Sequence, residues 1–197
     1  MGLAYRIFWP FVWVFVSLVY PRRTVGRKNR PGEGAYLICG NHSSMIDPFL
    51  VANSMGPSRQ IHFMAKAELF RIPVIGAFLR LIGMFPVDRE HGGAAAMKQA
   101  MKYLKNGEKV GMFPEGTRIS SEEASATKAG AVRIAARMEV PIVPVYIPRK
   151  KRVFRFNTIV IGEPYRIPLD KKASSEEFDQ AANELMAKIR ALGESVR

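Results

Sequence analysis

The sequence predicts an α/β domain built around a sheet, and two observations carry this prediction. Short apolar runs of strand length, such as 35–39, 109–113 and 142–147, alternate with segments whose apolar residues recur at helical spacing. This alternation is typical of layered α/β domains. The chain has 197 residues, of which 48% are hydrophobic, so one domain with its own core is expected. We expect a single layered domain in which helices flank a central mixed, mostly parallel sheet.

The N-terminal segment is apolar and aromatic, and we expect a membrane-associating helix to precede the layered domain. No charge interrupts residues 7–20, which are fewer than the roughly 20 residues that a bilayer-spanning helix needs. Trp9 and Trp13 favour the membrane interface, and Pro10 should bend or restart the helix. Five basic residues and no acid follow within 22–30. We therefore expect an interfacial anchor with a basic collar; an apolar helix packed on the protein's own core is the alternative.

After a turn-rich linker at 31–34, the expected elements alternate. Strands are expected at 35–39, 61–65, 83–87, 109–113, 142–147 and 153–161. Helices are expected around 48–53, as short pieces within 69–81, and at 94–104, 129–138 and 174–192. The last helix should begin with a capping box formed by Ser174 and Glu177.

A histidine and an aspartate stand five residues apart directly after the strand expected at 35–39. Neutral imidazole is a base available near pH 7, and a carboxylate can fix its tautomer, so His42 and Asp47 suggest a base and its orienting partner. Residues five apart do not face each other on a regular helix. We therefore expect Asp47 to fold back toward His42, with Ser43 or Ser44 as the helix N-cap. Taken alone, such a pair is also compatible with a plain helix start.

Composition limits the classes of partner and of site. The formal net charge is +13 and the pI is about 10.2, which indicates an anionic partner: nucleic acid, anionic lipid or an acidic protein. The basic run 149–152, with Arg155, adds to this charge. Cys39 is the single cysteine, so an internal disulfide and a Cys-rich metal site are excluded. There are three histidines and no HExxH pattern, so we expect no metal site and structural roles for His62 and His91.

Four sequence blocks in a fixed order resemble those of the glycerolipid acyltransferases. They are NHSSMID at 41–47, GMFPVDR at 83–89, FPEGTR at 113–118 and VPIVPV at 140–145. FPEGTR is the most specific block, and all four in order make a strong signature. The resemblance is closest to the bacterial 1-acylglycerol-3-phosphate (lysophosphatidic acid) acyltransferases and covers about residues 34–164. With it, the chain divides into an anchor, residues 1–30, and an acyltransferase domain, residues 31–197.

The resemblance implies transfer of a fatty acyl group from a thioester to the sn-2 hydroxyl of 1-acylglycerol-3-phosphate, which gives phosphatidic acid in phospholipid synthesis. His42 would be the general base, and Asp47 would hold its ring. A covalent route through Ser43 is the alternative, although the chain has no GxSxG pattern around it. The donor would be acyl-CoA or an acidic acyl carrier protein, used as co-substrate, and no cofactor is expected.

The resemblance also implies where the acceptor binds. The expected acceptor residues are Arg89, Glu115, Gly116, Thr117, Arg118 and Lys128. Gly116 lets the backbone approach the phosphate, Thr117 offers a hydroxyl, and Arg118 can form bidentate bonds. Arg89 would be a second phosphate ligand, while Lys128 fits either a phosphate ligand or a surface residue. Because a carboxylate repels phosphate, Glu115 is expected to orient Arg118 or Thr117, or to bind the glycerol hydroxyl.

Membrane lipids, including an anionic phospholipid surface, are the expected partners, and the cytoplasmic face of the cell membrane is the expected location. Two alternatives stay open. One is an acyltransferase for another lysolipid, such as a lyso-ornithine lipid or lysophosphatidylglycerol. The other is a non-enzymatic basic protein that binds membranes or nucleic acid; since no recognisable nucleic-acid module is present, nucleic acid is not expected.

Overall fold

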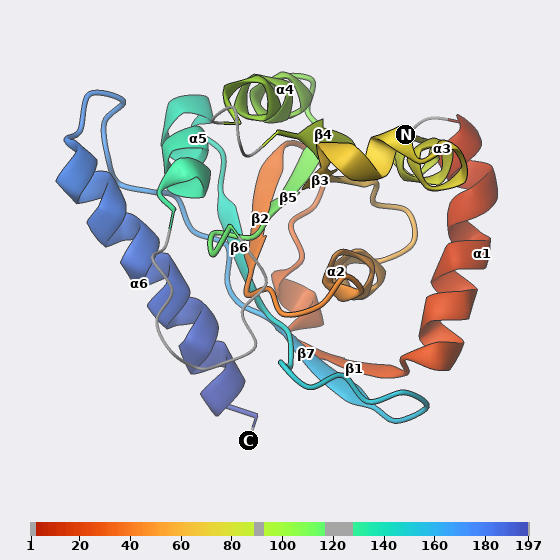
Figure 1. The fold of residues 1–197 in the computed structure, drawn as a ribbon. Helices are drawn as coiled ribbons and strands as arrows, with labels where there is room; N and C mark the ends of the chain where they lie inside the picture. The colour runs from red at the N-terminus through yellow and green to blue at the C-terminus, as the bar shows by residue number, and fades with distance from the viewer. Residues whose placement is uncertain (1–2, 89–92, 117–127, 197) are drawn as a thin grey trace.

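The computed structural model describes residues 3–88, 93–116 and 128–196, and a seven-stranded sheet forms its centre (Figure 1). The strand order is β1-β7-β6-β2-β5-β3-β4, and every neighbouring pair is parallel except β6 and β7. The strands are β1 (Arg22–Val25), β2 (Tyr36–Gly40), β3 (Ile61–Lys66), β4 (Phe85–Val87), β5 (Lys109–Met112), β6 (Ile142–Tyr146) and β7 (Asn157–Ile161). The expected α/β domain with a mixed, mostly parallel sheet is confirmed.

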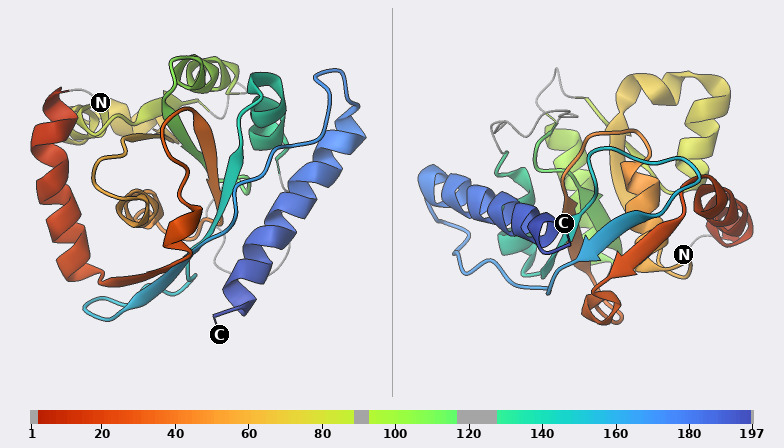
Figure 2. Two further views of the ribbon diagram at one scale, coloured as in Figure 1. Left: turned by 180° about the vertical axis from the view of Figure 1, so that it is seen from behind. Right: turned by 90° about the horizontal axis from the view of Figure 1, so that it is seen from below.

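Helices cover both faces of the sheet. The helices are α1 (Leu3–Val19), α2 (Asp47–Met55), α3 (Pro73–Leu81), α4 (Ala94–Lys105), α5 (Gly130–Met138) and α6 (Ser175–Glu194), with 3₁₀ turns η1 (Arg27–Asn29) and η2 (Ala67–Arg71). Side chains of β2 alternate between the two faces. Tyr36 and Ile38 pack with α1, α2 and α3, whereas Leu37 and Cys39 pack with α4, α5 and α6 (Figures 1 and 2). Two apolar layers therefore hold the sheet rigidly between them.

Most expected elements are present within one or two residues of their expected ends, including the short helical pieces at 69–81 and the Ser174–Glu177 capping box. Three local features differ from what the sequence suggested. Strand β7 begins only at Asn157, because the chain turns through residues 153–156. Pro10 lies inside α1, and the helix continues through it. Strand β1 was not expected at all, since its four residues, Arg-Arg-Thr-Val, lack an apolar alternation.

The segment expected to be a separate anchor contacts the rest of the domain. Tyr5, Trp9 and Val16 of α1 are buried in the core that α2 also helps to form. Strand β1 pairs with β7 and so extends the sheet. Arg22 of the basic collar is half-buried: its guanidinium donates to the Asn53 carbonyl at 3.0 Å, and burial lowers its pKa to about 10. Across residues 3–88, 93–116 and 128–196, none of the helices combines the length and apolarity required to cross a bilayer.

Candidate active site

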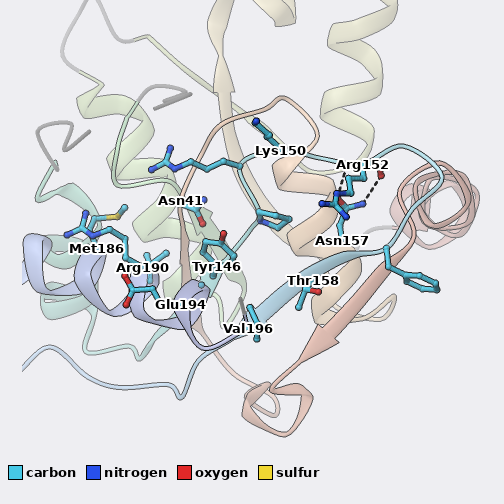
Figure 3. Close-up of a pocket in the computed structure, with 15 residues that line it drawn as sticks. Asn41, Tyr146, Lys150, Arg152, Asn157, Thr158, Met186, Arg190, Glu194 and Val196 are labelled. Carbon is cyan, nitrogen blue, oxygen red and sulfur yellow. Dashed lines mark hydrogen bonds between the residues drawn. The ribbon is translucent and has the colours of Figure 1, made fainter. Parts of the chain in front are cut away.

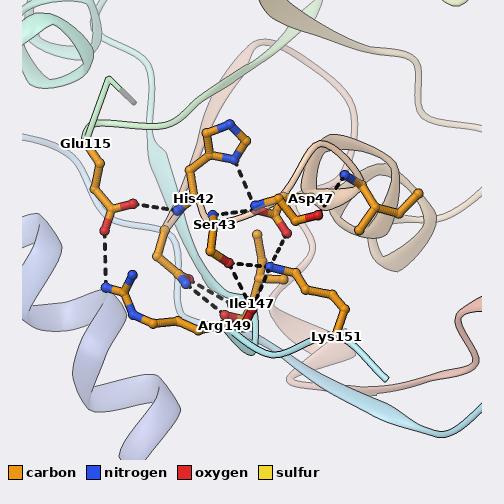
Figure 4. A network of polar contacts seen from close by, with 10 residues as sticks. His42, Ser43, Asp47, Glu115, Ile147, Arg149 and Lys151 are labelled. Atoms are coloured by element: carbon orange, nitrogen blue, oxygen red, sulfur yellow. Dashed lines mark hydrogen bonds and ion pairs between the residues drawn. The ribbon is translucent and has the colours of Figure 1, made fainter. Parts of the chain in front are cut away.

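Three loops meet at one edge of the sheet. Strands β6, β2 and β5 are adjacent and mutually parallel, so their carboxyl ends lie at the same edge. The loops that follow them carry residues 41–46, 113–116 and 147–151. In α/β sheets, ligands bind outside the carboxyl ends of the strands. Figure 4 shows polar side chains from all three loops gathered there.

The expected histidine–aspartate pair is present. His42 Nδ1 lies 3.0 Å from Asp47 Oδ2, and the Asp47 side chain is fully buried. The same oxygen accepts the backbone N–H groups of Ser43 and Ser44, both at 2.7 Å. Asp47 thus folds back to His42 as expected. The expected serine N-cap is wrong, because Ile46 holds that position and the carboxylate takes the serine N–H groups instead.

The His42 ring is fixed from a second side as well. It stacks on the Phe113 ring with 4.2 Å between the centroids, and 12% of the His42 side chain is exposed. When Nδ1 donates its proton to Asp47, the neutral imidazole carries its accepting lone pair on Nε2. A ring oriented in this way can take a proton from a bound hydroxyl.

Asp47 has a second, cationic partner in Lys151. The Lys151 Nζ lies 2.5 Å from Asp47 Oδ1 and 2.5 Å from Ser43 Oγ, and the lysine side chain is only 7% exposed. Burial alone would raise the pKa of Asp47, but the His42 ring and the Lys151 ammonium hold it below its usual range. Burial lowers the pKa of Lys151, against the opposing effect of Asp47. Lys151 is therefore a partner of the pair rather than a member of a solvated basic patch.

Glu115 connects the FPEGTR loop to the histidine. Its Oε2 accepts the backbone N–H of His42 at 2.6 Å, and its Oε1 lies 3.4 Å from an Arg149 guanidinium nitrogen. The Glu115 side chain is 5% exposed; burial raises its pKa, although the His42 N–H and Arg149 oppose that rise. Glu115 was expected to orient Arg118 or Thr117, which lie outside the described residues, or to bind the glycerol hydroxyl, and these expectations stay predictions. Among the described residues, Glu115 holds the backbone of His42 and contacts Arg149.

Asn41 closes the other side of the histidine loop. Its side-chain amide donates to the Ile147 carbonyl at 2.7 Å and accepts the Ile147 N–H at 2.9 Å. These two bonds tie the end of β2 to the end of β6. Sequence reasoning assigned no individual role to Asn41, and it placed Arg149 and Lys151 only in a basic run that suits an anionic partner. The only local signal was that Asn41 opens the first sequence block.

The remaining expected site residues divide into two groups. Gly116 and Lys128 lie together: Gly116 has φ +68°, and a Cβ added to it would lie 3.0 Å from Lys128 Cδ. A cavity of about 230 Å³ adjoins them, lined mainly by apolar side chains such as Met64, Met97 and Met112. The second group, which lies outside the described residues, comprises Arg89, Thr117 and Arg118.

The two other histidines were expected to have structural roles. His91 lies outside the described residues. His62 is engaged away from the site, since its Nδ1 lies 2.7 Å from the Gly83 carbonyl and its Nε2 lies 3.1 Å from Glu108.

Comparisons with known proteins agree on one family. A family model described as Acyltransferase matches residues 22–148. The 1-acyl-sn-glycerol-3-phosphate acyltransferase of Bacillus subtilis (strain 168) is 36% identical over 192 residues, which cover 91% of this chain and 95% of that relative. The protein of the same name from Streptococcus pneumoniae (strain ATCC BAA-255 / R6) is 32% identical over 173 residues. This match covers 82% of this chain and 62% of that relative.

A solved structure shares the fold. It is the crystal structure of the 1-acyl-sn-glycerophosphate (LPA) acyltransferase PlsC from Thermotoga maritima, with a TM-score of 0.65 and 24% sequence identity. The match covers 95% of this chain and 78% of that one. The overall fold is thus one that also occurs in a solved acyltransferase.

Proposed function

Because the chain belongs to the acyltransferase family, we propose that it transfers a fatty acyl group from an acyl thioester to the sn-2 hydroxyl of 1-acylglycerol-3-phosphate and so makes phosphatidic acid. The observation that carries this proposal is the His42–Asp47 pair at 3.0 Å, held where the ends of β2, β5 and β6 meet. The names of the B. subtilis and S. pneumoniae relatives support the choice of acceptor.

In this mechanism His42 is the general base. Nε2 takes the proton of the acceptor hydroxyl while the hydroxyl oxygen attacks the thioester carbonyl. The tetrahedral intermediate then collapses, the C–S bond breaks, and the His42 proton passes to the leaving thiolate. Asp47 holds the ring and stabilises its charged form. A general base contributes about a hundred- to ten-thousand-fold to such a step.

The surroundings of Ser43 favour this direct route over an acyl-enzyme. The Ser43 hydroxyl donates to the Arg149 carbonyl at 3.2 Å and lies 2.5 Å from Lys151 Nζ. A serine nucleophile needs its hydroxyl aimed at a base. The Ser43 hydroxyl is instead engaged by the Arg149 carbonyl and Lys151, which leaves His42 Nε2 for the hydroxyl of the substrate.

The acceptor phosphate is assigned to the β5 side of the histidine. Gly116 has no side chain to cover the backbone there, and the Lys128 side chain, which packs against it, supplies a positive charge. Arg89, Thr117 and Arg118 belong to this subsite by their places in the sequence blocks. Glu115 serves the subsite indirectly, because it fixes the His42 backbone against the loop that contains the phosphate ligands.

The substrates are lipids, and we assign the membrane contact to one apolar surface. It comprises the outer side of α1, the α3 helix and the turn between β6 and β7. Phe11, Val74 and Phe154 are 72%, 81% and 74% exposed, and the Phe154 N–H donates to the Val19 carbonyl at 2.8 Å, which joins the turn to α1 (Figure 2). An exposed apolar surface of this kind marks an interaction site. Arg23, Arg27 and Lys28, which follow α1 in the chain, are exposed and suit anionic lipid on the cytoplasmic face.

A transfer assay tests the proposed function. Purified protein is supplied with radiolabelled acyl-CoA or acyl carrier protein and a panel of acceptors: 1-acylglycerol-3-phosphate, lysophosphatidylglycerol and a lyso-ornithine lipid. We expect phosphatidic acid from the first acceptor, formed at least about a hundred-fold more slowly by the folded His42→Ala variant. Preferred transfer to another lysolipid would show that this lipid, and not 1-acylglycerol-3-phosphate, is the acceptor. Absence of transfer from either donor to any acceptor would reject the enzyme assignment.

A further inference from the structure

A second and larger cavity lies on the opposite side of the histidine loop from Gly116. It measures about 680 Å³ and opens between the C-terminal half of α6, the ends of β6 and β7, and the loop between these strands (Figure 3). Small-molecule sites in proteins are typically about 300–1,000 Å³. Four cations line it, Arg149, Lys150, Arg152 and Arg190, against the single acid Glu194. This lining favours an anionic ligand.

A buried asparagine organises the loop that carries three of these cations. Asn157 is 2% exposed, and its Nδ2 donates to the carbonyls of Arg152 and Arg155, both at 2.9 Å. Its Oδ1 accepts the Arg152 N–H at 2.8 Å. The backbone of the loop is therefore pre-arranged. Less conformational entropy is lost when a ligand binds to such a wall.

The cavity adjoins the reacting residues. Asn41 lines it and is followed directly by His42. Arg149 also lines it and lies 3.4 Å from Glu115, whose other oxygen accepts the His42 N–H. In the sheet, β2 has β5 on one side and β6 on the other. The acceptor block follows β5, so a second substrate has the β6 side available.

We propose that this cavity binds the phosphopantetheine arm of the acyl donor. This arm is common to acyl-CoA and acyl carrier protein, with a phosphate at one end and the thioester at the other. The cations would hold the phosphate by charge-assisted bonds, while the arm leads past Asn41 and presents the thioester carbonyl to the hydroxyl activated by His42. The inference rests on the proposed function and assigns to the donor a place separate from that of the acceptor.

Charge reversal tests the site by binding. The variants are Arg190→Glu, on α6, and Lys150→Glu, in the loop; Lys98→Glu is the matched control, since Lys98 is exposed on α4 outside both cavities. Calorimetric titration uses coenzyme A, 4′-phosphopantetheine and unphosphorylated pantetheine as probes. We expect the native and control proteins to bind the two phosphorylated probes more tightly than pantetheine. The Kd of these probes should rise about ten-fold or more in the two cavity variants.

Steady-state kinetics provide the second readout. In the cavity variants, the KM for the acyl donor should rise about ten-fold, and the KM for 1-acylglycerol-3-phosphate and the binding to anionic vesicles should stay native. Parallel assays with acyl-CoA and acyl carrier protein show which of them supplies the arm. If transfer occurs but phosphopantetheine affinity and donor KM equal those of the control, the inference fails and the proposed function stands. If charge-dependent binding occurs without transfer to any acceptor, the proposed function fails and the binding site stands. Loss of vesicle binding alone would show a lipid-headgroup patch and overturn the inference.

Discussion

The Nζ of Lys151 lies 2.5 Å from Oδ1 of Asp47, while Oδ2 of the same carboxylate faces the His42 ring. One buried carboxylate thus serves a cation and an imidazole at once (Figure 4). Burial alone would favour the protonated, neutral form of the Asp47 carboxyl group. The nearby lysine cation favours the ionised form instead. It also connects the loop after β6 to the first residue of α2. Lys151 is accordingly a positioning residue for the pair.

We predict that Lys151→Met destabilises the protein by about 3–5 kcal/mol, because it leaves the Asp47 charge buried without its cation. The double variant Lys151→Met/Asp47→Asn should regain part of the lost stability, because it no longer buries an uncompensated charge. Its activity should stay low, because Asp47 is lost. Urea unfolding of the two single variants and the double variant measures the coupling. Lys150→Met, which changes the exposed neighbour, is the control. Strictly additive losses would contradict a coupled buried pair.

His42→Ala and Asp47→Asn should each lower kcat by about a hundred- to ten-thousand-fold, the first through loss of the base and the second through loss of the correct tautomer. Ser43→Ala should keep activity within about ten-fold of native, because the Ser43 backbone N–H that binds Asp47 remains. Unfolding curves confirm that the variants are folded. An inactive Ser43→Ala beside an active His42→Ala would favour the covalent route.

Glu115→Gln and Arg118→Ala should differ in which kinetic constant they change. Glu115→Gln weakens a charge-assisted bond to the His42 backbone, so kcat should fall about ten-fold or more while the acceptor KM changes little. Arg118→Ala should instead raise the acceptor KM by a similar factor, as should Arg89→Ala, because a phosphate ligand is lost. Measuring kcat and KM against acceptor concentration separates the two effects. If Glu115→Gln raises the acceptor KM alone, its role is in binding the acceptor.

Phe11→Ser/Phe15→Ser should weaken membrane binding without unfolding the protein, since these side chains are 72% and 65% exposed on α1. Each phenylalanine contributes up to about 1.5–3 kcal/mol when it enters an apolar phase. Native protein should stay on anionic vesicles in about 0.5 M salt, because salt screens only the charges. The double variant should be released. Arg23→Gln/Lys28→Gln, the charge control, should bind more weakly than the native protein at low salt but equally well in about 0.5 M salt. Release of the native protein by salt alone would contradict apolar insertion.

Stability should decline as the pH falls below about 6.5, the ordinary pKa of histidine, partly because of His62. Burial lowers the pKa of His62, although the Gly83 carbonyl and Glu108 oppose that shift. The unfolded chain therefore takes up a proton that folded His62 resists, and the free energy of unfolding decreases as the pH falls through this range. The free energy of unfolding, measured with urea between pH 7 and 5.5, should change less with pH in His62→Gln than in the native protein. Equal slopes would contradict this account.

The sequence alone determined the class of the fold and the place of the His42–Asp47 pair. Alternating apolar runs and helical periodicity are local properties, so they predicted nearly every element, among them β2 and α2 on either side of His42. The five-residue spacing to Asp47 was likewise local. The same reasoning missed β1, because an edge strand of Arg-Arg-Thr-Val gains its place through pairing with β7, far along the chain.

Only the tertiary structure decided which charges are buried. Arg149 and Lys151 belong to a run of four cations, which the sequence predicted to be a basic patch for an anionic partner. The fold places the end of β6 beside the end of β2, so Lys151 meets Asp47 and Arg149 meets Glu115, in each case across the sheet edge. The same packing buries one side of α1 and leaves the apolar side chains of its other side exposed. A side chain's charge is local, but the desolvation and the partner that give it a role come from strands distant in sequence.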